Sequence, residues 1–160
     1  MYNSFIFLRD SIHVQVKPSA MPKLQFYVDS VLFDMDGVIA NTMPDHFLSW
    51  KMALRPEGIR VTHDDIYKRE GQPGLFSVRE IFRDYRKDYN TQRGARILRR
   101  KENLFKKIVK RRFIRGARTF IKQLHKSNFR LGLVTGTSRH ELRRILPEAL
   151  CGLFSQHRKV

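Results

Sequence analysis

The sequence predicts an α/β fold in which a parallel sheet forms the core and a helical segment is inserted between two strands. The run 28–33 is short, β-branched and aromatic, and 129–134 reads as a second buried strand. Polar residues follow each of the two runs. Between them, in 43–112, apolar residues recur at helical spacing. The 160 residues have room for one domain, or for one small core that carries an insertion.

Composition limits the class of protein. The apolar fraction of 41% is enough for a packed core and argues against wholesale disorder. The single Cys151 excludes an intramolecular disulfide framework and a cysteine-based zinc site, and it suits a reducing cytoplasm. No apolar run approaches the length of a membrane span, and 5–8 is too short for the core of a signal peptide. We therefore expect a cytoplasmic protein.

The formal net charge of +17 attracts nucleic acid or acidic surfaces whether or not such binding is the function. Much of this charge lies in 93–115, where basic residues are interspersed with apolar ones at helical spacing. These apolar residues are Ile97, Leu98, Leu104, Phe105, Ile108 and Val109. An amphipathic helix with a solvated basic face is the favoured interpretation. Because base-stacking aromatics are not interleaved with the basic residues, non-specific nucleic-acid binding is the alternative rather than specific RNA recognition.

The expected domain organisation follows from these patterns. Residues 1–20 carry no motif, so they are either a misassigned extension before a true start at Met21 or a loose additional strand. Residues 21–42 and 113–160 form the α/β core, and 43–112 forms a helical insertion without strands.

Several helices are predicted inside the insertion. The first has an apolar face and can end at Gly58. That face consists of Phe47, Trp50 and Leu54. Capping boxes at 62–65 and 77–80 predict two further helix starts, the first of these helices stopping at Gly71. The apolar stripe of the second consists of Val78, Ile81, Phe82 and Tyr85.

The chain is expected to return to the core at 113–116. A helix then ends near Asn128 and leads into the strand 129–134. Ser138 and Glu141 predict a capping box for the helix after that strand. The residues of these two helices expected to face inward are Phe120, Ile121, Leu124, Leu142, Ile145 and Leu146.

Two carboxylates follow the first strand. Asp34 sits where the strand ends, Asp36 follows it, and Gly37 lets the backbone turn sharply. In open α/β sheets ligands bind at the carboxyl ends of the strands. A carboxylate there can act as a nucleophile, and a second can carry protons or help to hold a cation. An Asp-x-Asp-Gly run alone is more often a turn or part of a calcium loop, but no EF-hand ligands follow at the required spacing.

The second strand runs into Thr135, Gly136, Thr137 and Ser138 at the start of a helix. Backbone N–H groups, the positive end of the helix dipole and hydroxyl groups there would cradle a phosphate. An ordinary capped helix is the alternative. Two such strand ends, one with paired carboxylates and one with hydroxyls, favour the phosphate site.

The chain resembles the haloacid dehalogenase superfamily, in its phosphoglycolate-phosphatase and β-phosphoglucomutase-like branch. The matching motifs are Asp-Met-Asp-Gly-Val at 34–38 and Leu-Val-Thr-Gly-Thr at 133–137. The insertion resembles the cap domain of that branch, and 113–124 resembles the segment that returns from the cap, where a Pro is commoner than Arg115. The resemblance covers 24–154 and implies a Rossmann-like core.

The resemblance implies metal-dependent phosphoryl transfer from a small phosphorylated metabolite, such as phosphoglycolate or a sugar phosphate. Asp34 would attack phosphorus to form an aspartyl phosphate. Asp36 would protonate the leaving oxygen and then activate water. Thr135 and the backbone of Gly136 would hold the phosphoryl group. Mg²⁺ would bind the Asp34 carboxylate and the Asp36 carbonyl.

The same resemblance narrows the chemistry. Dehalogenases of this fold generally lack the second carboxylate, so Asp36 favours phosphate chemistry over carbon–halogen cleavage. Phosphatases and phosphomutases use the same pair, and both remain open. Cap residues normally select the substrate. Arg69, Gly71 and Gln72 lie in a cap turn, where Arg69 and Gln72 are candidate substrate contacts, although an ordinary surface position is the favoured interpretation of Arg69.

The sequence departs from the family after the second motif. The family also needs a Lys and a later acidic metal ligand, but no acidic residue follows Glu148, and Lys159 is not in the family's Lys-Pro context. We therefore expect a truncated or frameshifted product with an incomplete core, an unpaired edge on the first strand, no third strand in 154–160, and weak or no turnover. The alternative is a basic nucleic-acid-binding or scaffold protein with a remnant hydrolase fold.

Overall fold

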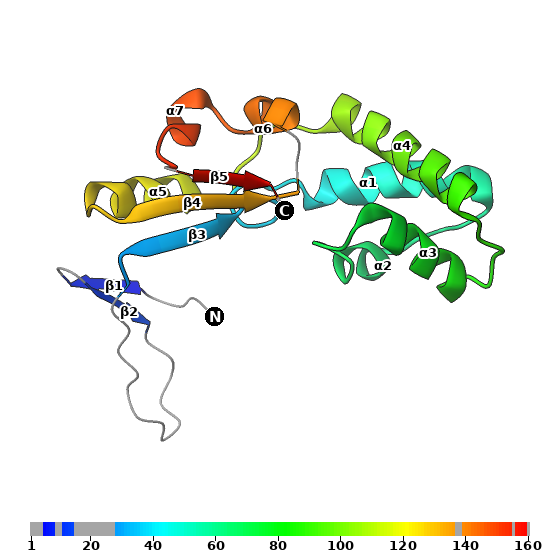
Figure 1. The fold of residues 1–160 in the computed structure, drawn as a ribbon, viewed down its shortest axis with the longest axis horizontal. Helices are drawn as coiled ribbons and strands as arrows, with labels where there is room; N and C mark the ends of the chain where they lie inside the picture. Colours follow the sequence, from blue (N-terminus) through cyan, green and yellow to red (C-terminus); the bar gives the residue numbers. More distant parts are fainter. Residues whose placement is uncertain (1–4, 9–10, 15–27, 137–138, 155, 160) are drawn as a thin grey trace, which may run out of the picture.

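The computed structural model describes residues 5–8, 11–14, 28–136, 139–154 and 156–159. It confirms the α/β fold class: an α/β core lies on one side and a purely helical cap on the other, as Figure 1 shows. None of the helices in these ranges is both long enough and apolar enough to cross a bilayer.

The core is built on three parallel strands, β3 (Ser30–Asp34), β4 (Arg130–Thr135) and β5 (Gln156–Lys159), in the order β3-β4-β5. β3 and β4 pair from Ser30 opposite Arg130 to Asp34 opposite Val134. The expectation that 154–160 forms no strand was wrong. The polar side chains of that tail do not show a strand pattern, but its backbone pairs with β4 along the edge opposite β3.

The first strand is less buried than its apolar sequence predicted. Phe33 is buried, whereas the Leu32 side chain is 73% exposed. Among the strands described, β3 pairs only with β4, so the expected unpaired edge is confirmed for this part of the chain. Leu32 lies over Gly132 of β4, where a Cβ atom would come within 2.4 Å of a Leu32 methyl carbon.

The helices of the core explain this exposure. α5 (Ala117–Lys126) precedes β4, while α6 (Arg139–Ile145) and α7 (Glu148–Cys151) follow it. Both connections step along the sheet in one direction, and right-handed crossovers then place their helices on the same face. One apolar cluster contains residues of this sheet face and of these helices: Phe33, Leu131, Leu133, Ile121, Leu124, Leu142, Ile145, Leu146 and Leu150. The Leu32 side chain lies on the opposite face of the sheet and is not part of this cluster.

The cap consists of α1 (Met43–Leu54), the short 3-10 helix η1 (Arg55–Glu57), α2 (His63–Tyr67), α3 (Gly74–Asp84) and α4 (Thr91–Ile108). The described residues 43–112 contain these helices and no strand. The cap has its own apolar cluster, which comprises Trp50, Ala53, Leu54, Ile59, Val61, Ile66, Val78, Ile81, Phe82 and Ile97. The cap therefore has an interior of its own, while Phe105 of α4 belongs to the apolar cluster of the core.

Helix starts in the cap were only partly predictable. Gly58 has the left-handed φ of 70° expected of a helix end, and the box of Thr62 with Asp65 is present. α2 ends at Tyr67 and turns replace helix before Gly71. The predicted box at 77–80 was wrong because α3 already starts after Pro73, whose fixed φ suits a helix start, so Ser77 lies inside the helix. Outside the cap, Ser138 was predicted to form a capping box with Glu141 at the start of the helix after β4. Ser138 lies outside the described residues, so this box stays a prediction.

Two neighbouring segments join the cap to the core. The Asn41 N–H donates to the Arg112 carbonyl at 2.9 Å, and the Ile114 N–H donates to the Ile39 carbonyl at 2.9 Å. The buried Asp45 carboxylate accepts from the Arg112 guanidinium at 2.7 Å. The chain thus returns to the core at 113–116, directly beside the segment that leaves it.

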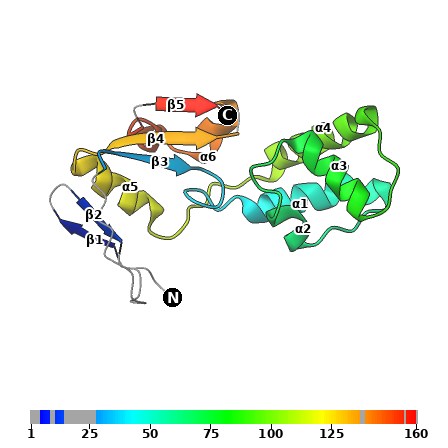
Figure 2. The same ribbon diagram turned by 60° about the horizontal axis from the view of Figure 1, so that its bottom comes forward.

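Within 1–20, β1 (Phe5–Leu8) and β2 (Ser11–Val14) form an antiparallel hairpin. Figure 2 shows this hairpin as a two-stranded sheet separate from β3, β4 and β5. In place of the single loose strand expected in 1–20, this segment therefore contains a paired hairpin.

Candidate active site

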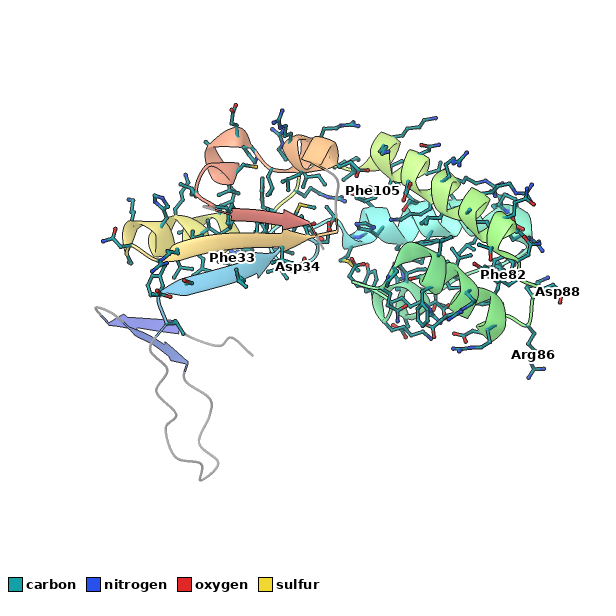
Figure 3. All side chains as sticks on the ribbon, in the orientation of Figure 1. Phe33, Asp34, Phe82, Arg86, Asp88 and Phe105 are labelled. Carbon is teal, nitrogen blue, oxygen red and sulfur yellow. The ribbon has the colours of Figure 1, made fainter. Side chains whose placement is uncertain are left out.

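A pocket of about 720 Å³ lies between the core and the cap. Its core wall comes from the ends of β3 and β4, and its cap wall comes from α1, the α2–α3 turn, α3 and α4. Figure 3 shows Asp34 at the end of β3 that faces the cap. All six residues predicted for the site line this pocket: Asp34, Asp36, Arg69, Gln72, Thr135 and Gly136.

The strand register and one tight turn bring the core residues together. Because Asp34 pairs with Val134, the buried Thr135 lies one residue further along at the same edge of the sheet. The chain then turns at Gly37, whose φ is 75°, and the Gly37 N–H donates to a carbonyl three residues on at 2.9 Å. A side chain at Gly37 would be strained by this φ and would meet Met43 at 3.2 Å.

The Asp34 carboxylate has an environment that disfavours its charge. Loss of water contact raises the pKa of Asp34, and the neighbouring Asp36 raises it further, while a 2.8 Å hydrogen bond from the Met35 N–H opposes the shift. A cation bound beside these two carboxylates would favour their charged forms.

Asp36 is held by side chains from α1 and the segment before it. The Thr42 hydroxyl donates to Asp36 Oδ1 at 2.5 Å, and His46 Nε2 lies 3.5 Å from the same oxygen. The His46 ring stacks on Phe105 of α4 with centroids 4.1 Å apart. On its other side, His46 Nδ1 lies 3.1 Å from Lys101 Nζ. Lys101 of the cap is therefore linked to the Asp36 carboxylate of the core through the imidazole of His46.

Lys101 has an unusual position for a lysine. Its ammonium lies 5.5 Å from the Trp50 ring and 5.1 Å from the Phe105 ring. Burial lowers the pKa of Lys101, and surrounding carboxylates such as Glu70 and Glu102 oppose this shift. With Lys101 as the donor, His46 Nδ1 accepts, and the imidazole proton then lies on Nε2, facing Asp36.

Arg69 is buried, which corrects the expectation of a surface position. Its guanidinium pairs with Asp84 of α3, donates to the Asp65 carbonyl of α2, and lies 3.5 Å from Glu80. The side chain thus spans the gap between two helices. Its neighbour Gln72 is half-buried and accepts a 3.4 Å hydrogen bond from Ser77. Substrate contact by Arg69 and Gln72 stays a prediction.

The chain matches the model of the haloacid dehalogenase-like hydrolase family over residues 31–153, which include the strand ends, the cap and the returning segment. The chain belongs to this family.

Three relatives agree with that assignment. The chain is 29% identical over 121 residues to the phosphorylated carbohydrates phosphatase of Thermotoga maritima, covering 71% of this chain and 52% of that protein. A structure assigned as a β-phosphoglucomutase from Bacteroides vulgatus has a TM-score of 0.65 at 27% identity, covering 76% of this chain and 51% of that one. The β-phosphoglucomutase of Clostridium difficile has a TM-score of 0.69 at 18% identity, covering 82% and 61%, and shows a shared fold. The chain spans about half the length of the first two relatives.

The site of this family member offers few protein ligands to a metal ion, and Mg²⁺ can bind with few. Across 28–136 and 141–154, whose side chains are described, no three His, Cys, Asp or Glu side chains gather as a metal cluster. Mg²⁺, however, commonly uses one or two protein oxygens and fills its shell with water and phosphate. The Asp34 carboxylate, with its raised pKa, fits such a ligand. The Asp36 carboxylate already accepts a hydrogen bond from Thr42, so the backbone carbonyl of Asp36 is the candidate second ligand.

Sequence reasoning missed Thr42, His46 and Lys101, and a signal for the last was present. Lys101 lies four residues from both Ile97 and Phe105, so it occupies the apolar stripe of α4 rather than its basic face. A charged residue on the buried stripe of an amphipathic helix needs a partner inside the protein.

Proposed function

We propose that this chain carries the nucleophile and acid–base half of a Mg²⁺-dependent phosphatase for small phosphorylated metabolites of the phosphoglycolate or sugar-phosphate class. The observation that supports the proposal is one pocket in which paired carboxylates from β3 adjoin a threonine and a glycine from β4. Phosphoryl transfer depends mostly on positioning and on neutralisation of charge, which such a pocket can provide.

In the first step, a carboxylate oxygen of Asp34 attacks phosphorus while the bond from phosphorus to the leaving oxygen breaks. The Asp36 carboxyl gives its proton to that oxygen, so the alcohol leaves neutral and an aspartyl phosphate remains on Asp34. The Thr135 hydroxyl and the Gly136 N–H donate hydrogen bonds to the phosphoryl oxygens.

In the second step, the Asp36 carboxylate removes a proton from water, and the resulting oxygen attacks phosphorus. The bond between phosphorus and Asp34 breaks, which releases phosphate and restores both carboxyl groups. Thr42 and His46 hold Asp36 in place through both steps, and Lys101 holds His46. When bound, Mg²⁺ would offset the negative charge of Asp34 and the phosphoryl group, with Asp34 and the Asp36 carbonyl as its protein ligands.

Phosphomutase chemistry is the second candidate because the same aspartyl phosphate can pass its phosphoryl group to a sugar hydroxyl instead of water. The names of the β-phosphoglucomutase relatives favour testing it. Its signature is conversion of β-glucose 1-phosphate to glucose 6-phosphate without release of free phosphate.

The test uses single-turnover conditions, with protein in excess over substrate, because weak turnover is expected. Phosphoglycolate, p-nitrophenyl phosphate and β-glucose 1-phosphate are each incubated with the protein and Mg²⁺, and free phosphate and glucose 6-phosphate are measured. We expect phosphate release that EDTA abolishes, and an acid-stable phosphoryl adduct on the peptide that contains Asp34.

Asp34→Asn is the decisive variant, and Asp64→Asn, at an exposed position on α2 away from the pocket, is its matched control. Phosphate release that survives Asp34→Asn would remove the nucleophile assignment. Product formed as glucose 6-phosphate alone would replace the phosphatase proposal by the mutase one.

A further inference from the structure

We propose that the outer face of α4 binds the phosphodiester backbone of a nucleic acid without reading its sequence. We define the outer face by the residues that line a second, shallow groove of about 370 Å³: Arg96, Arg99, Arg100, Asn103, Leu104 and Lys107. This surface is distinct from the phosphatase pocket and does not depend on the proposed catalysis.

One helix separates the two surfaces. Lys101 and Phe105 of α4 line the pocket, whereas Arg96, Arg99 and Lys107 line the outer groove. The outer-face residues lie along a single side of the helix, because each of them up to Leu104 has another three or four positions further on. The acidic Glu102 of α4 lines the pocket, so the outer groove itself contains no carboxylate.

The charge of the outer face is largely unpaired. Arg100 is anchored by the Ala53 carbonyl at 3.0 Å and lies 3.6 Å from Glu57. By contrast, Arg96, Arg99 and Lys107 are exposed and form no ion pair or hydrogen bond through their side chains with any residue whose side chain the structure describes. Three full positive charges are therefore available to an external anion.

The basic surface continues from α4 onto α6. The Arg111 guanidinium, just past the end of α4, donates to the Arg144 carbonyl at 3.1 and 3.2 Å. This contact holds α6 and its exposed Arg143 and Arg144 next to the end of α4. Figure 3 shows nitrogen-tipped side chains along the sides of α4 and α6 that face away from the other cap helices.

The chemistry of this surface fits a phosphodiester chain better than a membrane. The only apolar residue of the groove, Leu104, is half-buried, so no exposed apolar side chain is there to enter a bilayer. Guanidinium groups match phosphate oxygens bidentately. From Arg96 to Lys107 the helix rises by about 16 Å, and duplex DNA carries about one negative charge for every 1.7 Å of its axis.

Base readout is not expected from this geometry. The opposite side of α4 packs against α1 and α3, so only the outer face of this helix can contact a nucleic acid. The outer groove is lined by no aromatic side chain on which a base could stack. Binding should therefore be electrostatic, insensitive to sequence and strongly dependent on salt.

The test measures binding of a labelled DNA duplex and a labelled single-stranded RNA by fluorescence anisotropy across a range of salt concentrations. The test variant carries Arg96→Gln, Arg99→Gln and Lys107→Gln. The matched control carries Arg115→Gln, Lys122→Gln and Lys126→Gln, which removes the same charge from exposed positions on and near α5. Circular dichroism checks that both variants fold.

We expect the test variant to reduce the slope of log K against log salt by about 2.7 for duplex DNA and about 2.1 for single strands, because each lost phosphate contact contributes about 0.9 or 0.7. The control should keep nearly the full slope. Equal losses in both variants, or no binding at low salt, would overturn the proposal. Displacement by polyglutamate as effective as displacement by nucleic acid would also overturn it, in favour of an acidic protein partner.

Discussion

The Nε2 atom of His46 lies 3.5 Å from the Oδ1 atom of Asp36, and that nitrogen has no hydrogen-bond partner among the described residues. A buried N–H without a hydrogen-bond partner costs free energy. A small closure of the cap onto the core would shorten the contact with Asp36 and would therefore be favoured. Catalytic hydrogen bonds are often long before the substrate binds. The position of the cap and the acid–base group are thus linked through one side chain.

Lys101→Met should lower kcat by about 10- to 100-fold, within the range that a positioned acid–base group contributes. The variant removes the donor that fixes the His46 ring, so Asp36 loses a fixed neighbour and the pH–rate profile should change shape. Lys106→Met is the control, because Lys106 lines the same pocket from the same helix without contacting His46. An unchanged pH profile in Lys101→Met would contradict the positioning role.

Thr42→Val should lower kcat/KM by about tenfold or more. The Thr42 hydroxyl donates to Asp36 Oδ1 at 2.5 Å, so the variant loses the hydrogen bond that positions this carboxyl group. A hydrogen bond to a charged group contributes about 1.5–3 kcal/mol, and a loss of about 1.4 kcal/mol in the transition state is tenfold in rate. The control is Thr62→Val, which removes the α2 cap at a residue that does not line the pocket and should lower stability without lowering kcat/KM.

Arg69→Met should lower the midpoint of thermal unfolding by several degrees. The variant removes the buried guanidinium that joins Asp84, Glu80 and the Asp65 carbonyl. Arg83→Met tests the same two carboxylates from an exposed side chain and should have a much smaller effect. Equal midpoints for the two variants would show that burial of Arg69 does not matter.

Asp34→Asn should stabilise the fold at pH 7. The pKa of Asp34 is raised in the folded protein, so the folded state binds this proton more tightly than the unfolded state does, and ionisation above the ordinary value of 3.8 costs stability. The gain should therefore shrink as the pH falls and disappear below about 3.8, where both states are protonated.

Thermal unfolding of wild type and Asp34→Asn at neutral and acidic pH measures this difference. Asp29→Asn provides the opposite sign, because a hydrogen bond from Ser30 and the charge of Arg130 lower the pKa of Asp29. A loss of stability in Asp34→Asn at pH 7 would contradict the unfavourable environment assigned to its carboxylate.

The elements that follow from local patterns could be predicted. Short apolar runs followed by polar residues located β3 and β4, and helical spacing located the cap. The meeting of Asp34 with Thr135 followed from strand direction alone, since the carboxyl ends of parallel strands share one edge.

Features decided by tertiary contacts could not be predicted. Exposure of Leu32 depends on the face of the sheet on which the crossover connections place their helices. The strand sequence does not say which face that is. Arg69 looks like any polar turn residue until α3 supplies Asp84. The link from Lys101 to Asp36 requires two helices to pack at a particular offset, which a single helical pattern does not specify.

The bare edge of β3 has a consequence for handling the protein. Leu32 and the unpaired strand edge offer a site where two copies could adhere, while the net charge of +17 keeps copies apart. At about 1 M salt the Debye length falls to about 3 Å, so this mutual repulsion is screened. A high-salt wash, of the kind that removes nucleic acid from basic proteins, would then also promote aggregation. Light scattering should therefore show the best-dispersed preparation at intermediate ionic strength.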